Sequence, residues 1–263
     1  MSDTENGSNG TGPTPFREGE PVLLIADDGT VLAAMAGETL RRGRTVVPTS
    51  AVIGRSPGDR IRILGIEHTL ARPQWTDILR SIERGPQTIM QETIALMVHL
   101  AAVSPGATVV EGGTGSGALT LALAALVGPG GSLHTFDISE RHLEVARRNL
   151  RRAGLHDRVK IHRGPVEDAR IRGVDAVLLD LPRPWVALDM AGRALRPGGS
   201  LVAHLPTTTQ VERLMRTIGG GFTAPRATEA IHRSWVLSRG GTGLRPAFEA
   251  PAHAGFLVHT RRI

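Results

Sequence analysis

The 263-residue chain contains no cysteine and no tyrosine, and its aromatic residues are limited to five phenylalanines and three tryptophans. The absence of cysteine excludes disulfides, zinc–thiolate centres and a thiol nucleophile. No apolar run approaches the roughly 20 residues of a membrane-spanning helix, and the polar N-terminus has no signal-peptide core. We therefore expect a cytoplasmic protein that does not contact a membrane.

The charge of the chain is moderately positive. Lysine and arginine number 31 against 25 aspartates and glutamates, which gives a formal net charge of +6. Most of the cations are arginine, whose planar guanidinium suits bidentate contacts with phosphate. A surplus of this size is also usual for a solvated surface, so charge alone only weakly favours a nucleic-acid partner.

The composition divides the chain into three parts. Residues 1–15 are Ser, Gly, Asn, Thr and Pro with almost nothing to bury, which predicts a disordered tail. Residues 16–72 predict a small β domain, because short apolar runs are separated by turn residues. Residues 73–263 alternate strand-like and helix-like patterns, which is typical of an α/β domain. The β domain is either a structural cap or oligomer contact, or a module that docks the substrate.

Within the β domain, the apolar runs Pro21–Ile25 and Val31–Met35 flank an Asp-Gly pair and predict a hairpin. Further strands are expected at Thr45–Val47 and Arg60–Ile63.

The most informative stretch runs from Thr108 to Asp137. An apolar run opens it as a buried strand, the glycine turn EGGTGSG follows, and an apolar helix is expected over Ala118–Val127. A second strand, Ser132–Phe136, ends on Asp137, where a carboxylate commonly receives ribose hydroxyls. The pattern predicts the first half of a nucleotide-binding βαβ unit.

The second half of the sheet is expected around Val174–Leu179, which is nearly all apolar and therefore reads as a central parallel strand. It ends in the sequence DLPRPW, which begins at Asp180, and ligands of α/β sheets bind at the carboxyl ends of strands. Other helices are predicted over 73–84, 89–103, 140–153 with Ser139 as N-cap, 185–195 and 208–218. Other strands are predicted over 158–162, 200–205, 228–236 and 255–260, with a turn over Arg196–Gly199.

The spacing E-x-G-x-G-x-G resembles the cofactor loop of class I S-adenosylmethionine-dependent methyltransferases. Further motifs narrow the resemblance, namely RGPQ from Arg84, DLPRPW from Asp180, TTTQV from Thr207, RSW from Arg233 and AGFLV from Ala254. With them, nearly everything after Phe16 resembles the tRNA (adenine-58-N1)-methyltransferase family. The resemblance implies a Rossmann-like class I methyltransferase fold with a mostly parallel seven-stranded sheet, preceded by the small N-terminal β domain.

This family binds S-adenosylmethionine, methylates N1 of an adenine in the T-arm of tRNA and is typically a homotetramer. By resemblance, Asp180 is the catalytic aspartate and accepts a hydrogen bond from the adenine amino group. The alternative interpretation of Asp180 is purely structural, as a helix N-cap before Pro182. Trp185 is either a core residue or a wall of the ligand site. The resemblance implies no metal and a cofactor site made of Gln87, Glu111, Gly113, Gly115, Ser116, Gly117, Asp137 and Asp180.

The chain departs from the family pattern at four places, one of which is the stretch from Arg245 to Ala254, where the family usually has R-P-x-x-x-x-x-H-T. Met90 and His204 stand where the family usually has aromatic residues, tyrosine in the second case. Pro165 stands where an acid commonly follows the third strand, with Glu167 or Asp168 as candidate substitutes. Flipped bases are generally held by stacking, so these losses leave the methyl acceptor open. His204 either fills the tyrosine's place with an apolar body and a polar tip, or acts as a catalytic general base.

Three functions are therefore carried forward. The first is an N-methyltransferase that acts on a tRNA adenine. The second is a paralogue that methylates a small molecule, such as a nucleoside or a specialised metabolite. The third is a catalytically idle protein that binds RNA.

Overall fold

The computed structural model describes residues 13–42, 45–82, 89–238, 242–247 and 254–263. The chain divides into two compact units, Met1–Ser81 and Ile82–Ile263, which we call the N-terminal unit and the C-terminal unit. Throughout the described ranges, each helix is too short or too polar to span a bilayer.

The N-terminal unit contains a four-stranded antiparallel sheet in the order β2-β1-β6-β5. The predicted hairpin is confirmed, because β1 pairs with β2 around a turn in which Gly29 has a φ of 82°. Apolar side chains of Phe16, Leu24, Ile61 and Leu70 form its core. Its elements are β1 (Pro21–Ala26), β2 (Val31–Met35), β3 (Thr39–Arg42), β4 (Thr45–Pro48), β5 (Arg60–Ile63), β6 (Ile66–Ala71) and the helix α1 (Trp75–Ser81), with β3 and β4 forming a separate ribbon.

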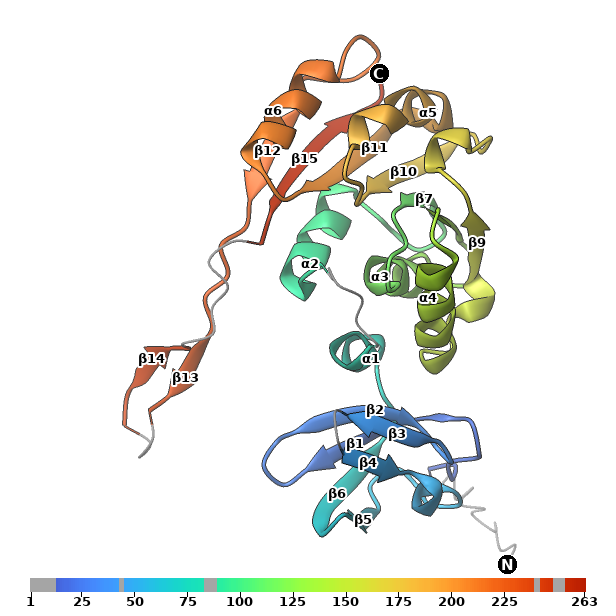
Figure 1. The fold of residues 1–263 in the computed structure, drawn as a ribbon, viewed down its shortest axis with the longest axis vertical. Helices are drawn as coiled ribbons and strands as arrows, with labels where there is room; N and C mark the ends of the chain where they lie inside the picture. Colours follow the sequence, from blue (N-terminus) through green and yellow to red (C-terminus); the bar gives the residue numbers. More distant parts are fainter. Residues whose placement is uncertain (1–12, 43–44, 83–88, 239–241, 248–253) are drawn as a thin grey trace, which may run out of the picture. The chain divides into compact units, whose positions relative to one another are not determined.

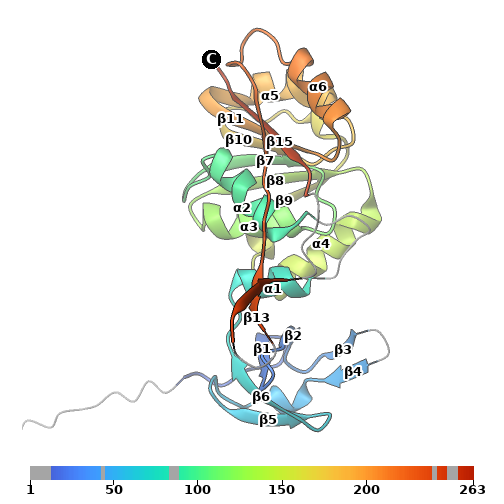
Figure 2. The same cartoon turned by 90° about the vertical axis from the view of Figure 1, so that its left-hand side faces the viewer.

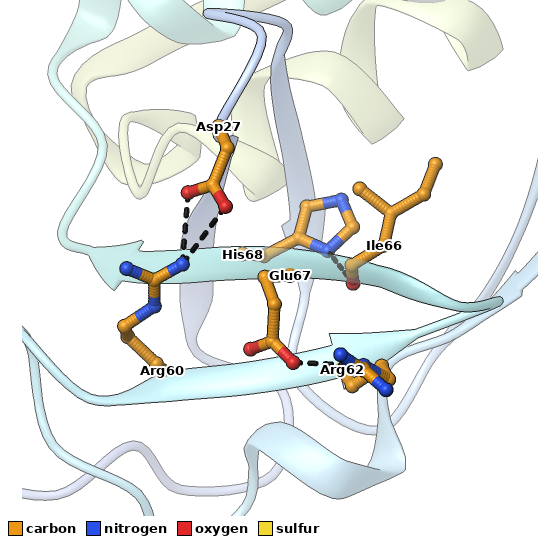
Figure 3. Close-up of polar contacts among 6 residues, drawn as sticks. All are labelled: Asp27, Arg60, Arg62, Ile66, Glu67 and His68. Carbon is orange, nitrogen blue, oxygen red and sulfur yellow. Dashed lines mark hydrogen bonds and ion pairs between the residues drawn. The ribbon is translucent and has the colours of Figure 1, made fainter.

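Charged side chains of β5 are paired with carboxylates of β6 and of the turn after β1. Figure 3 shows Arg60 donating to both carboxylate oxygens of Asp27, each at 2.9 Å. Arg62 donates to Glu67 at 2.8 Å on the same hairpin. Exposed ion pairs of this kind contribute little stability, about 0–1 kcal/mol each. Their effect is to occupy the two guanidinium groups.

The C-terminal unit is built on a seven-stranded sheet in the order β12-β15-β11-β10-β7-β8-β9. Strands β11, β10, β7, β8 and β9 run parallel, and β15 is antiparallel to both β11 and β12. The strands are β7 (Thr108–Gly112), β8 (Ser132–Asp137), β9 (Val159–Arg163), β10 (Val174–Leu179), β11 (Leu195–Leu205), β12 (Arg226–Glu229) and β15 (Phe256–Arg261). The expected Rossmann-like, mostly parallel sheet is confirmed.

Helices cover both faces of this sheet. Figures 1 and 2 show α2, α3 and α4 on one face and α5 and α6 on the other. The helices are α2 (Gln91–Leu100), α3 (Ala118–Val127), α4 (Glu140–Arg152), α5 (Leu188–Ala194) and α6 (Thr208–Thr217), with short 3₁₀ turns η1 (Ser50–Val52) in the N-terminal unit and η2 (His156–Arg158), η3 (Val166–Asp168) and η4 (Pro184–Ala187) in this one. On one side of β7 the sheet continues with β8 and β9, and on the other side it continues with β10 and β11. The strand order therefore reverses between β7 and β10. Ligands of open α/β sheets bind at the carboxyl ends of strands at such a point.

Two predicted elements differ from the structure. The single late strand over 228–236 is wrong, because β12 ends at Glu229 and a separate ribbon begins at β13 (Trp235–Leu237), paired with β14 (Leu244–Pro246). In the described residues β15 starts at Phe256, opposite Glu229, so the pairing of β12 with β15 ends there. The expected turn over Arg196–Gly199 instead belongs to β11, which pairs with β10 on both sides of an irregularity in register.

Candidate active site

The glycine loop after β7 lies directly against the end of β10. The Gly113 and Thr114 amides both donate to the Phe136 carbonyl, at 2.9 and 3.2 Å, and this fixes the loop to β8. A Cβ atom on Gly113 would stand 2.1 Å from the Asp180 carbonyl oxygen, and the φ of Gly113 is 94°. Only glycine accommodates both the backbone conformation and the close approach.

The space beside Gly115 is open. This residue has a φ of 53°, and no described atom would lie within 4 Å of a Cβ placed on it, apart from its chain neighbours. Its amide donates to Asp137 Oδ2 at 2.9 Å. Gly117, at the start of α3, has a φ of 85°, and a Cβ atom placed on it would lie 3.1 Å from the Cβ of Ala146 in α4. The loop therefore packs tightly at both ends and leaves room in its middle.

Asp137, at the end of β8, is held by three neighbours. Oδ2 accepts from Gly115 and lies 3.3 Å from His142 Nδ1, and Oδ1 accepts from the Ser139 amide at 2.8 Å. Its side chain is 9% exposed. The predicted N-cap is confirmed, because Ser139 Oγ accepts from the His142 amide. The carboxylate is thus immobilised at the rim of the open space, next to Ile138, which is 73% exposed.

Glu111 is completely buried at the end of β7. Its Oε2 accepts from the Thr120 hydroxyl at 2.7 Å, and Oε1 has no hydrogen-bond partner within the described part of the chain. Burial raises the pKa of Glu111 to about 8; the Thr120 and Thr135 hydroxyls oppose the rise, and the negative charges of Asp180 and Asp137 add to it. A buried carboxyl oxygen without a partner is costly and is expected to have a use.

The structure adds one residue that the sequence analysis missed. Asn149 of α4 is fully buried, and its side-chain amide donates to the Ser116 carbonyl at 2.8 Å. The signal was present in the sequence as a single polar residue on the apolar face that Leu143, Ala146 and Leu150 form. Asn149 thus supports the glycine loop from the helix behind it.

Replacing Asn149 with leucine should loosen this loop. The variant keeps the number and branching of the side-chain heavy atoms but leaves the Ser116 carbonyl without this buried donor, which costs about 1–3 kcal/mol. We expect a lower unfolding temperature in calorimetry and weaker S-adenosylmethionine binding in titration. Glu144→Gln, on the exposed face of the same helix, should change neither value, and unchanged binding in Asn149→Leu would contradict the supporting role.

Asp180, directly after β10, meets His204 of β11. The Asp180 amide donates to the Gly112 carbonyl at 2.8 Å, which ties the ends of β7 and β10 together. His204 Nδ1 lies 3.0 Å from Asp180 Oδ1, and His204 Nε2 lies 3.1 Å from the Ala254 carbonyl oxygen. The His204 side chain is 14% exposed and that of Asp180 33%. The fold therefore brings together two candidate residues that are 24 positions apart in the sequence.

The two motifs DLPRPW and TTTQV are joined by Gln210. Its side-chain amide donates to the Pro182 carbonyl at 3.0 Å, and its Oε1 accepts from the Thr207 hydroxyl at 2.8 Å. Trp185 is half-buried against the core, and the Arg213 guanidinium lies 4.0 Å from the centre of its ring. The loop after Asp180 is therefore held from the start of α6.

The remaining candidates lie around these groups or outside the described residues. Gln87 lies outside them, so its role stays a prediction. Met90 directly precedes α2 and is half-buried, and Pro165 precedes η3. Of the candidate substitutes for the missing acid, Glu167 is half-buried and Asp168 is exposed.

These residues fit S-adenosylmethionine by their chemistry. Asp137 supplies a carboxylate beside the loop, and the buried Glu111 carboxyl supplies a hydrogen-bonding group behind it, which suits a ligand that carries ribose hydroxyls and an ammonium group. The Glu111 oxygen without a partner and the open space beside Gly115 lie on the same loop. Exposed Ile138 next to Asp137 offers an apolar surface to a nucleobase.

Comparison with known proteins gives consistent relatives. The family model described as "tRNA methyltransferase complex GCD14 subunit" matches residues 73–244. The tRNA (adenine(58)-N(1))-methyltransferase TrmI of Thermus thermophilus is 34% identical over 250 residues, 94% of each chain. The tRNA (adenine(57)-N(1)/adenine(58)-N(1))-methyltransferase TrmI of Methanocaldococcus jannaschii is 32% identical, over 73% of this chain and 77% of its own.

Solved structures agree on the fold. The tRNA (m1A58) methyltransferase TrmI of Aquifex aeolicus superimposes with a TM-score of 0.76 at 27% identity, covering 95% of this chain and 99% of its own. A SAM-dependent O-methyltransferase from Thermotoga maritima gives a TM-score of 0.82 at 24% identity over 94% of both chains, which bears on the fold alone.

Proposed function

The chain belongs to the tRNA (adenine-58-N1)-methyltransferase family, and we propose that it transfers the methyl group of S-adenosylmethionine to N1 of an adenine in the T-arm of tRNA. The observation that carries this proposal is the junction of the glycine loop with Asp180, where the Asp180 amide bonds to Gly112 and its carbonyl abuts Gly113. A cofactor loop and a candidate catalytic carboxylate share one edge of the sheet. Because tRNA is the proposed substrate, the proposed place of action is the cytoplasm.

In this proposal the cofactor is held by the loop and its carboxylates. Asp137 binds the ribose hydroxyls, the backbone of Gly113, Gly115 and Gly117 admits the ligand closely, and Glu111 provides a buried acceptor behind it. Ser116 is fixed from behind by Asn149. When bound, S-adenosylmethionine supplies an electrophilic methyl carbon attached to a positively charged sulfur.

Asp180 is the proposed partner of the target base. Its Oδ1 is engaged by His204, so Oδ2 is the oxygen assigned to the amino group of the adenine. The N1 lone pair forms the new C–N bond as the C–S bond breaks, and the positive charge moves to the base. No proton has to leave, because adenine N1 carries none. A carboxylate that accepts from the amino group therefore gains strength as charge develops on the base.

The positive net charge of the chain lies in the C-terminal unit. Residues 1–81 contain nine arginines and ten carboxylates, and residues 82–263 contain 22 basic residues and 15 carboxylates. In the N-terminal unit, the guanidinium groups of Arg60 and Arg62 are engaged by Asp27 and Glu67 (Figure 3). We therefore assign the phosphate contacts of the RNA mainly to the C-terminal unit.

The proposal is tested with labelled S-adenosylmethionine and an unmodified tRNA transcript. We expect incorporation of label and, after digestion, 1-methyladenosine as the modified nucleoside by mass spectrometry. A matched transcript with guanine in place of the target adenine should take up no label. Label on that control transcript would place the methyl group elsewhere. Turnover of free nucleosides without turnover of tRNA would favour an enzyme that acts on a small molecule. Cofactor binding without any methyl transfer would favour a catalytically idle RNA-binding protein.

We also propose that the protein is a homo-oligomer, a tetramer as the family resemblance implies. Cross-strand pairing places Trp235 opposite Pro246 and Leu237 opposite Leu244 on one face of the β13–β14 ribbon. Trp235 is 56% exposed and the two leucines 66% each. An apolar face of this kind on a two-stranded ribbon favours burial against a second copy.

Leu237→Glu should therefore lower the molar mass in solution. A charge on this face opposes its burial, and the opposite face supplies a matched control in Val236→Glu, because adjacent strand residues point to opposite sides. Light scattering after gel filtration should give an oligomer for the parent and for Val236→Glu, and a smaller species for Leu237→Glu. A monomeric parent protein would refute the proposed oligomer. If the molar mass of Leu237→Glu equals that of the parent, this face of the ribbon does not form the interface.

A further inference from the structure

His204 lies between two hydrogen-bond acceptors. Its Nδ1 faces the Asp180 carboxylate at 3.0 Å and its Nε2 faces the Ala254 carbonyl at 3.1 Å. A neutral imidazole carries one N–H and one lone pair, so it satisfies only one of these partners, whereas an imidazolium donates to both. A general base in this place would have no nitrogen lone pair directed at a substrate.

The second acceptor is built into the backbone beside β15. A Cβ on Gly255 would lie 2.3 Å from His204 Nε2, and the φ of Gly255 is 88°. Glycine at this position is what lets the chain bring the Ala254 carbonyl up to the ring. The backbone at Gly255 therefore brings a second acceptor within hydrogen-bond distance of the ring.

We propose that His204 is a positioning residue that works as a doubly protonated imidazolium, holding Asp180 Oδ1 so that Oδ2 is presented to the target adenine. The part that concerns the adenine rests on the proposed function, whereas the protonation state of His204 does not. The methyl transfer itself releases no proton, so the reaction leaves no task for a base. The imidazolium also partly neutralises Asp180, which limits direct pairing of this carboxylate with a cationic sulfonium.

The electrostatic surroundings agree with this arrangement. Burial by itself lowers the pKa of His204, but the hydrogen bond and the charge of Asp180, together with the Ala254 carbonyl, outweigh burial and raise the pKa above its usual value. Asp180 is the only charged group in the described part of the chain that shifts this pKa, although α2, α6 and β15 also pack against β11. The shift therefore favours the protonated ring over a wider pH range than for a free imidazole, and the ring loses its proton as the pH rises through the elevated pKa.

The protonation state can be measured without any turnover. Nitrogen-15 NMR of the labelled full-length protein reports whether each imidazole nitrogen carries a proton, and the signals of His204 are those absent in His204→Phe. We expect both nitrogens to be protonated at neutral pH and the ring to titrate above its usual range. A single protonated nitrogen at neutral pH would overturn the proposal.

The pH dependence of turnover with tRNA separates the two roles by sign. If His204 positions Asp180 as a cation, kcat falls on the alkaline side as the ring loses its proton; if it were a base, kcat would rise there instead. The matched pair His204→Phe and His204→Tyr differs by one hydroxyl. We expect Phe to lower kcat at neutral pH about tenfold with the KM for tRNA nearly unchanged, because the geometry of Asp180 is lost.

His204→Tyr should restore much of this loss, since its hydroxyl donates to Asp180, and it should remove the alkaline decline up to the usual tyrosine pKa of about 10. His259→Gln, two residues beyond the β15 residue that pairs with His204, should keep the parent profile. A decline retained in His204→Tyr would overturn the proposal. If no variant or parent methylates tRNA, the proposed function fails, and the NMR result still decides the protonation of His204.

Discussion

Asp180→Asn is expected to lower kcat for tRNA methylation by about 100-fold, within the range usual for removing one group that stabilises charge developing in the transition state. Asparagine has nearly the same shape, but it is neutral and can turn its amide nitrogen toward the amino group of the adenine. The interaction that strengthens as positive charge develops on the base is then lost. Single-turnover kinetics with labelled cofactor measure the effect on the chemical step directly.

Cofactor binding should change little in Asp180→Asn, because the loop is held by backbone bonds of Gly112 and Gly113 that the substitution leaves in place. Asp175→Asn is the matched control, since Asp175 lies at the other end of β10 and bonds to Thr108 and Arg196. It should cost some stability and leave kcat at the parent value. Equal losses in the two variants, or an unchanged rate in Asp180→Asn, would remove Asp180 from the catalytic role.

Gly115→Val is expected to weaken S-adenosylmethionine binding by about 100-fold or more, corresponding to at least about 2.7 kcal/mol. The valine side chain would meet no described protein atom within 4 Å at its Cβ and would fill the open space assigned to the cofactor. The positive φ adds strain of about 1–2 kcal/mol for a non-glycine residue. Isothermal titration gives the dissociation constant, and thermal unfolding reports the strain separately.

Gly106→Val is the matched control for this strain. Gly106 also has a positive φ, of 84°, and open space around its Cβ, but it lies before β7, at the other end of the strand from the loop. Both variants should lose similar stability, and only Gly115→Val should lose the cofactor. Normal cofactor binding by Gly115→Val would mean that the ligand does not pass beside this residue.

The sequence alone predicted most of the C-terminal unit. The βαβ stretch from Thr108 to Asp137, the apolar strand Val174–Leu179 and the cap at Ser139 were all identified, because each depends on local periodicity or turn chemistry. In the N-terminal unit, β6 was missed, since Ile66–Ala71 mixes polar and apolar residues and is specified by its pairing with β1 and β5. The predicted end of the strand at β12 was wrong for the same reason, because β12 ends where its pairing with β15 ends.

The candidate site divides in the same way. Local spacing identified Glu111, the glycines and Asp137, because a cofactor loop is one contiguous turn between a strand and a helix. Only the tertiary structure decided that Asn149 supports this loop from α4 and that His204 lies between Asp180 and Ala254. Those contacts join residues 24 to 50 positions apart, and whether a histidine faces acceptors or a free space is fixed by packing, which no local pattern records.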